Sequence, residues 1–179
     1  MNLKAELRAE HSKAQTMRIV GWIGGSSKRF GELAAIVTGE EPLLAQRGAW
    51  AVSHCAESNP TVVRDSLLDL LEHLRRPDLH DAIKRNVMKA VSIGELDEDS
   101  AGLAADIAFE LLGSPDEAVA TKVYSMSVLQ QVCEMEPELV QELKMHIEQQ
   151  LPLTKKPAFH SRARHVLRAL DELGAESLG

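Results

Sequence analysis

Histidine and cysteine are the side chains best suited to hold a transition metal or to act as a base or nucleophile. The chain has seven histidines and two cysteines. No two histidines stand in an H-E-x-x-H or H-x-x-x-H spacing, which would place both on one helix face. His54 and Cys55 are adjacent, so a helix would point them about 100° apart, and Cys133 stands by itself in sequence. We therefore expect no metal site, no cofactor and no catalytic residues, and the chain is predicted not to be an enzyme.

A segment over residues 24–28, Gly-Gly-Ser-Ser-Lys, looks like a loop that cradles phosphate. It lacks the G-x-x-x-x-G-K-[ST] spacing, and the residues before it have the period of a helix and not of a strand. Glycine is common just after a helix and serine just before one. We interpret the segment as the place where one helix ends and the next begins.

Composition excludes several classes of protein. The chain has 179 residues and a mass of 19.7 kDa, enough for one domain or at most two small ones. Its net charge of −7 argues against a general nucleic-acid binder. No apolar run is long enough to span a membrane, and no signal peptide is visible. The two isolated cysteines fit a reducing compartment, so a cytoplasmic location is expected.

The apolar residues recur at helical spacing between the prolines. All seven prolines lie at breaks between periodic segments and none lies inside one. Proline is tolerated in the first turn of a helix but not in its interior, and Asn59-Pro60, Ser114-Pro115 and the acidic run 97–100 read as helix starts. No stretch shows the alternation of a strand. The fold class is therefore predicted to be all-α.

Aromatic residues make up only 3% of the chain, so the core is expected to be mostly leucine, alanine, valine and isoleucine. Trp50 is expected to pack between helices and Trp22 to be partly exposed. Cys55 and Cys133 are interpreted as small core residues.

The predicted helices come in pairs at a nearly constant period. A basic residue opens each first helix, and the intervals between these residues are 38, 37 and 40: Arg47, Arg85, Lys122 and Arg162. One helix pair cannot bury its own apolar face, whereas stacked pairs bury a continuous core. The period therefore favours an α-solenoid over the alternative, a helical bundle without repeats.

This arrangement resembles HEAT or armadillo-type repeats over residues 12–172. The Asp–Arg ladder of a strong HEAT match is absent, although Arg64 and Asp65 resemble one turn of it. The resemblance implies an α-α superhelix of about four helix pairs plus a terminal helix, in a single domain over 1–179. The expected elements are an irregular first pair at about 2–38, pairs at about 43–74, 79–112 and 117–151, and a terminal helix at about 158–173.

The second helices of the pairs carry most of the negative charge. Segments 61–74, 97–112 and 137–151 have net charges of −2, −5 and −2, while residues 1–30 have a net charge of +4. In HEAT-like proteins the second helices line the concave groove, so the resemblance implies an acidic groove that favours a basic peptide or protein segment. Solvated helix faces are the alternative explanation of these charges. The candidate partner-binding residues are Asp65, Asp69, Glu72, Asp106, Glu110 and Glu142.

The resemblance implies a non-catalytic protein-protein interaction module or scaffold, of unspecified oligomeric state. The alternative is a HEAT-like nucleic-acid-binding protein or a DNA repair protein that acts on alkylated bases. That family is usually basic along its concave face, whereas this chain is acidic. A local basic surface for the alternative would be formed by Lys28, Arg29, Arg162, Arg164 and Arg168.

Overall fold

The computed structural model describes residues 1–176, and every regular element in that range is helical, which confirms the all-α prediction. The chain divides into two compact units, Met1–Glu95 (unit 1) and Leu96–Gly179 (unit 2). The boundary falls inside the helix pair predicted at 79–112. No helix of the described residues is both long and apolar enough to cross a membrane.

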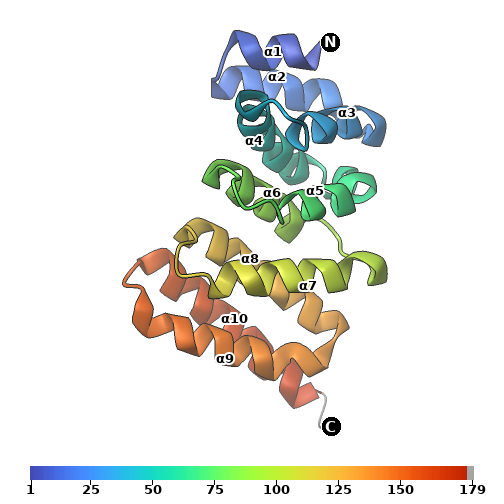
Figure 1. Cartoon of the computed structure of the whole chain (residues 1–179). Helices are drawn as coiled ribbons and strands as arrows, with labels where there is room; N and C mark the ends of the chain where they lie inside the picture. Colours follow the sequence, from blue (N-terminus) through green and yellow to red (C-terminus); the bar gives the residue numbers. More distant parts are fainter. Residues whose placement is uncertain (177–179) are drawn as a thin grey trace. The chain divides into compact units, whose positions relative to one another are not determined.

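In unit 1, α4 is the central helix and packs against α2, α3 and α6 (Figure 1). The short helix α1 lies against α4, and α3 lies beside the 3-10 segment η1. The first helices α2, α4 and α6 thus pack in succession, and the second helices α3 and η1–α5 do the same. The elements are α1 (Leu3–Ala9), α2 (Lys13–Ile23), α3 (Ser27–Val37), α4 (Pro42–Ser58), η1 (Pro60–Ser66), α5 (Leu67–His73) and α6 (Asp81–Ile93).

In unit 2, α8 packs between α7 and α10, and α9 contacts both α7 and α10 (Figure 1). The four basic residues that mark the period lie on the first helices α4, α6, α8 and α10, as expected, but they lie inside these helices and do not open them. The elements are α7 (Glu98–Gly113), α8 (Val119–Met135), η2 (Pro137–Leu139), α9 (Val140–Gln150), η3 (Leu151–Leu153) and α10 (Pro157–Glu176).

Two helix starts confirm the sequence interpretation. After α2, Gly24 has a φ of 52°, a left-handed conformation that glycine adopts without strain. Ser26 Oγ then accepts a hydrogen bond from Arg29 N at 3.3 Å, so the 24–28 segment is a helix-to-helix turn. At the start of α7, Asp97 and Ser100 cap each other's backbone N–H groups in a capping box.

Other predicted boundaries were wrong. Ser114-Pro115 does not start a helix, because Ser114 ends α7 with its N–H bonded to Glu110 O, and α8 begins only at Val119. Segment 61–74 is not one α-helix either, since it begins as a 3-10 helix in which Thr61, Val62 and Val63 are β-branched and resist α-helical packing. The irregular pair expected at about 2–38 contains three helices, because its first part is interrupted at 10–12 and forms α1 and α2 ahead of α3.

The core of the described residues is aliphatic, as composition predicted. Phe30 and Phe159 are the largest fully buried side chains, and leucine, valine, isoleucine and alanine fill the rest. Cys55 and Cys133 are buried, and Trp22 is half-buried, as expected. Trp50 is also only half-buried, and it contacts the His11 ring edge-on at a centroid distance of 5.3 Å.

Candidate functional site

The six acidic candidate residues are all exposed and divide equally between the two units. Asp65, Asp69 and Glu72 lie on η1 and α5 of unit 1, at spacings that place them along one side of the segment. Asp106 and Glu110 on α7 and Glu142 on α9 belong to unit 2. The six residues are therefore two separate groups of three.

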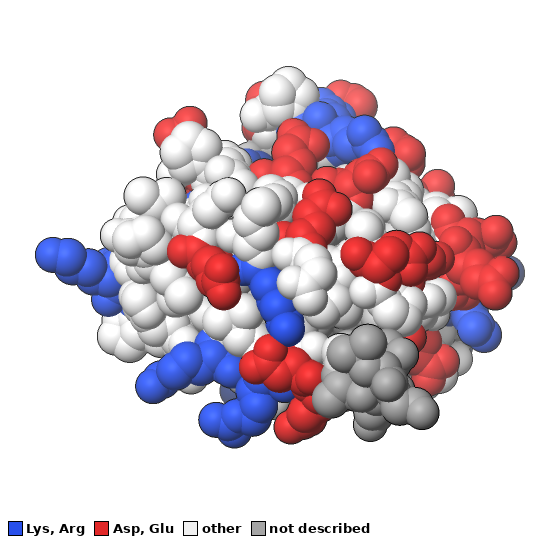
Figure 2. Space-filling view, turned by 90° about the horizontal axis from the view of Figure 1, so that it is seen from below, with Lys and Arg blue, Asp and Glu red and all other residues white. Residues whose placement is uncertain are grey.

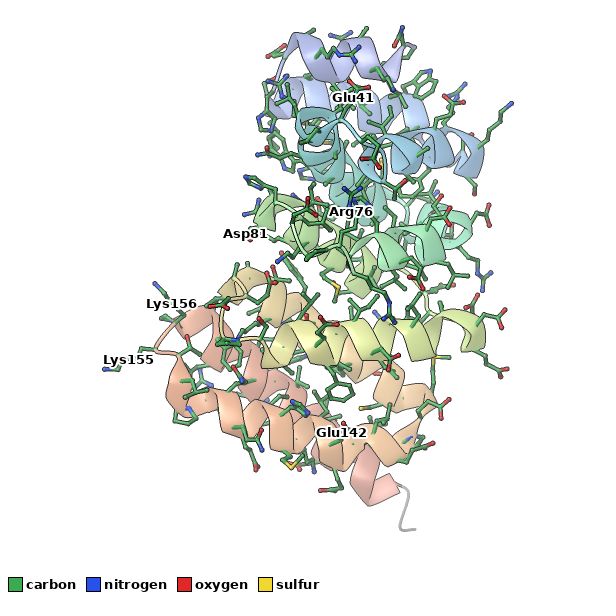
Figure 3. The ribbon with its side chains drawn as sticks, viewed as in Figure 1. Glu41, Arg76, Asp81, Glu142, Lys155 and Lys156 are labelled. Atoms are coloured by element: carbon green, nitrogen blue, oxygen red, sulfur yellow. The ribbon has the colours of Figure 1, made fainter. Side chains whose placement is uncertain are left out.

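A cavity of about 300 Å³ in unit 2 brings two of these residues together. It lies between α7 and α9, and Figure 3 labels Glu142 on its α9 side. Glu110 is not among its lining residues. We call this the acidic cavity, and its lining residues are Gly102, Ala105, Asp106, Phe109, Val132, Glu136, Glu138, Leu139 and Glu142.

Sequence reasoning missed two carboxylates of the acidic cavity. Glu136 and Glu138 flank Pro137 in the turn before α9, and although Glu138 belongs to the acidic segment 137–151, neither residue is among the candidates predicted from sequence. A pair of glutamates on either side of a proline that starts a helix is the signal that could have identified them, because acids are favoured at helix N-termini. Their side chains lie within hydrogen-bonding reach of each other.

The carboxylates of the acidic cavity repel one another. A hydrogen bond that protonated Glu136 donates to Glu138, and then the negative charge of Glu138, raise the pKa of Glu136, with smaller contributions from desolvation and from Glu98. Carboxylates that lie close together repel one another when they are ionised. A cation that binds among them is stabilised, because its charge offsets this repulsion. The acidic cavity is thus electrostatically suited to a lysine or arginine side chain.

The wall of the acidic cavity also suits such a side chain. Phe109 is half-buried and its ring lies 5.0 Å from the His146 ring, tilted by 47°. An aromatic face attracts a cation, and the aliphatic stem of lysine or arginine packs well on apolar surface. Phe109 and Leu139 would contact the stem while Asp106 and Glu142 bind the charged end.

The basic candidate residues also divide between the units. Lys28 and Arg29 lie in the first turn of α3 in unit 1, and Arg29 is held by Trp22, with its guanidinium carbon 4.8 Å from the centre of the indole. The remaining three, which lie on α10 of unit 2, are Arg162, Arg164 and Arg168.

The basic residues of unit 2 adjoin a shallow hollow. Arg162 lines it together with Ser161 and His165, and Lys155 and Lys156 precede α10 (Figure 3). Acidic side chains are nevertheless widespread on the face drawn in Figure 2, in keeping with the net charge of −7.

The cysteines are placed for packing and not for chemistry. Burial raises the pKa of Cys55 to about 12. Burial and the nearby charge of Glu134 raise the pKa of Cys133 to about 11. A thiol with such a pKa is protonated at neutral pH and is a poor nucleophile and metal ligand. Within residues 1–176, no three His, Cys, Asp or Glu side chains are grouped so that they could hold a metal ion.

Comparison with known proteins identifies the repeat. No curated protein sequence and no solved structure matches the chain. The family model described as a HEAT repeat domain matches residues 3–170, which include every helix from α1 to α9 and most of α10. This match agrees with the paired helices and with the period of the basic residues on the first helix of each pair. The chain therefore belongs to the HEAT repeat domain family.

Proposed function

We propose that this chain is a non-catalytic protein-binding module, a scaffold that docks a basic segment of a partner protein in the acidic cavity of unit 2. HEAT repeats commonly mediate protein-protein interaction or scaffolding. The observation that carries the proposal is the group of four carboxylates around the Phe109 ring, in a cavity of about 300 Å³ between two second helices.

The negative charge of the acidic cavity would act at two stages of binding. At a distance, it would steer a basic segment and speed the encounter, within a screening length of about 8 Å at physiological salt. In contact, a lysine or arginine head would pair with Asp106 and Glu142 while its stem covers Phe109. The bound cation would also offset the carboxylate repulsion that raises the pKa of Glu136, and this would make the binding free energy more favourable.

A labelled peptide of alternating lysine and alanine tests the proposal by fluorescence anisotropy at low and physiological salt. Glu142→Lys is expected to weaken binding about tenfold, equivalent to ~1.4 kcal/mol. Glu148→Lys is the matched control, because Glu148 is exposed on the same helix but does not line the cavity. Equal affinities for the two variants would overturn the acidic cavity as the docking site.

The same assay compares the two acidic groups and the nucleic-acid alternative. Asp69→Lys in unit 1 reports whether the exposed acids of η1–α5 bind the same peptide. Short single-stranded or duplex DNA, added as a competitor, is expected to leave the anisotropy of the labelled peptide complex unchanged. In a gel-shift assay at low salt, the chain is expected not to retard either DNA. A salt-dependent shift that is lost in Arg162→Glu would instead favour the nucleic-acid alternative.

We also propose a cytoplasmic location for this module. Its support is the presence of two free, buried cysteines, which persist most readily where thiols are kept reduced. Fractionation of cells that express a tagged chain tests this proposal, and recovery outside the cytoplasmic fraction would overturn it.

A further inference from the structure

The charges of unit 2 are unevenly distributed along its sequence. The unit has seven lysine and arginine residues against fifteen aspartate and glutamate residues, a net charge of −8. Five of the seven basic residues nevertheless lie between positions 155 and 168, and no acidic residue occurs from 149 to 170. We call these five residues the α10 basic surface: Lys155, Lys156, Arg162, Arg164 and Arg168.

The α10 basic surface is accessible. Four of its five residues are exposed and Arg162 is half-buried. Figure 3 shows Lys155 and Lys156 projecting outward from the turn before α10. A partner can therefore reach these charges without any rearrangement of the helix.

Four polar side chains of α10 lie on one side of the helix. At 100° per residue they fall within an arc of about 100°, and all four are exposed: Ser161, Arg164, His165 and Arg168. Ser161 and His165 also line the shallow hollow beside Arg162. An anion on this side thus meets two guanidinium groups together with the hydrogen-bond donors of a hydroxyl and an imidazole.

The cations of the α10 basic surface have no acidic partner within the chain. None of the five forms an ion pair with any residue that the structure describes. Lys144 of the same unit, by contrast, is paired with Asp171 at 2.7 Å. Arg164 and Arg168 are like charges at i and i+4, an arrangement that destabilises a helix. Binding of an anion would relieve this repulsion.

The extent of the surface favours a short ligand with a row of carboxylates. From Pro157 to Arg168 the helix rises about 17 Å, and the exposed residues Asp171 and Glu172 follow. A long polyanion would be repelled beyond Arg168, whereas a short acidic segment would not. Alternate side chains of an extended peptide are about 6.6 Å apart, close to the rise of about 6 Å over four helical residues.

The same surface lacks a platform for nucleic-acid bases. Phe159 is the one phenylalanine of α10, and its side chain is fully buried. Proteins that bind single strands combine positive charge with exposed aromatic rings on which the bases stack. A protein ligand is therefore favoured over a nucleic acid.

We propose that the α10 basic surface binds an acidic segment of a protein partner. Successive carboxylates of the segment would pair with Arg164 and Arg168, and its end would reach Lys155 and Lys156. The argument is charge complementarity, because five unpaired cations are gathered in a unit of net charge −8. The inference rests on the proposed protein-binding function for the class of partner, but it uses a different surface. Unit 2 then has two docking surfaces of opposite charge.

A labelled peptide of alternating glutamate and alanine is the probe, and a peptide of alternating glutamine and alanine is its neutral match. Fluorescence anisotropy with the full chain is expected to show saturable binding of the glutamate peptide at low salt, weakening as the salt concentration rises. The glutamine peptide is expected not to bind. Equal binding of the two peptides, or no saturable binding of the glutamate peptide at low salt, would overturn the proposal.

Arg164→Glu is expected to weaken binding of the glutamate peptide at least tenfold. The new carboxylate would stand at i and i+4 with Arg168, a pairing that stabilises a helix, so the loss would not come from unfolding. Lys13→Glu is the matched control, because Lys13 is an exposed cation of unit 1 and the net charge changes equally. If both variants bind the glutamate peptide with the same affinity, the ligand does not occupy the α10 basic surface.

Two further measurements distinguish this occupant from others. A single-stranded oligonucleotide with as many negative charges as the peptide is expected to be the weaker competitor, and stronger competition would assign the surface to nucleic acid instead. Light scattering is expected to give the same mass for the original chain and Arg164→Glu at every concentration. A concentration-dependent mass that Arg164→Glu abolishes would show that a second copy of the chain occupies the surface.

The outcomes at the two surfaces of unit 2 are separable. At physiological salt, Glu142→Lys is expected to leave binding of the glutamate peptide unchanged, and Arg164→Glu is expected to leave binding of the lysine peptide unchanged. Failure of the glutamate peptide to bind would remove the α10 basic surface alone. Failure of the lysine peptide to bind would remove the acidic cavity as a docking site.

Discussion

Ser53 Oγ on α4 lies 3.1 Å from Asn86 Oδ1 on α6 and 3.0 Å from Trp50 O of its own helix, inside the apolar core of unit 1, and its hydroxyl can donate to either oxygen. The orientation of the Asn86 amide follows from its other contact, because Nδ2 donates to Ala82 O at 2.8 Å. This pair is a buried polar link between two first helices, which are also joined by the ion pair of Lys89 Nζ on α6 with Glu57 Oε1 on α4 at 2.6 Å.

Ser53→Ala is expected to destabilise the chain by about 1–3 kcal/mol, because it leaves Asn86 Oδ1 buried without a donor. Urea unfolding followed by far-UV circular dichroism measures the change. Ser127→Ala is the control, since Ser127 bonds only to Val123 O within its own helix. If both variants lose the same stability, the link between α4 and α6 is not what Ser53 contributes.

Gly48→Ala is expected to destabilise unit 1, because a Cβ atom at Gly48 would lie 3.0 Å from Val37 Cγ2 and 3.5 Å from Leu33 Cδ1. The expected cost is about 1–3 kcal/mol, measured by thermal unfolding. Val37→Ala combined with Gly48→Ala should recover part of the loss.

Gly102→Ala provides the opposite case, because a Cβ atom there meets nothing within 4 Å. Alanine is the better helix former by about 1 kcal/mol, so this variant is expected to be more stable than the original. Stabilisation by Gly48→Ala as well would show that α3 and α4 do not pack as closely as described.

The paired carboxylates of the acidic cavity give a pH-dependent prediction. The pKa of Glu136 is raised in the folded state, so its protonated form favours folding at low pH, and this contribution is lost as the pH rises through the raised value. Glu138→Gln is expected to lower the pKa of Glu136 and to stabilise the chain more at about pH 7 than at about pH 4. A ¹³C NMR titration of the glutamate carboxyls reads the pKa directly.

Glu98→Gln is the graded control for this titration, because Glu98 makes the smallest of the contributions that raise the pKa of Glu136. It is expected to move that pKa in the same direction but less than Glu138→Gln does. A larger effect of Glu98→Gln would contradict the contact between Glu136 and Glu138.

The thiols are expected to be inert in the folded chain. With pKa values of about 12 for Cys55 and about 11 for Cys133, neither should react with Ellman's reagent at about pH 8, and both should react after denaturation. Ser161→Cys supplies an exposed thiol as a positive control. Rapid reaction of the unaltered folded chain would show that one cysteine is accessible.

Features with local causes were predictable from sequence. The turn from α2 to α3 depends on Gly24 and Ser26, and the start of α7 depends on Asp97 and Ser100, so in each case the determining residues lie within one helical turn. The positions of the first helices were predictable for a similar reason, because the period of the basic residues follows the repeating helix pair.

Features with tertiary causes were not predictable. Glu136 and Glu138 are remote in sequence from Asp106, and only the packing of α9 against α7 places them around one cavity.

The division between Glu95 and Leu96 has a consequence for synthesis of the chain. Each unit draws its compact core from one continuous stretch of sequence, so all the residues of unit 1 leave the ribosome before those of unit 2. Chains are made at about 5–20 residues per second and fold from the N-terminus in such units. Unit 1 can therefore begin to fold before unit 2 has emerged, and the capping box at Asp97 then starts α7 with partners from its own first turn.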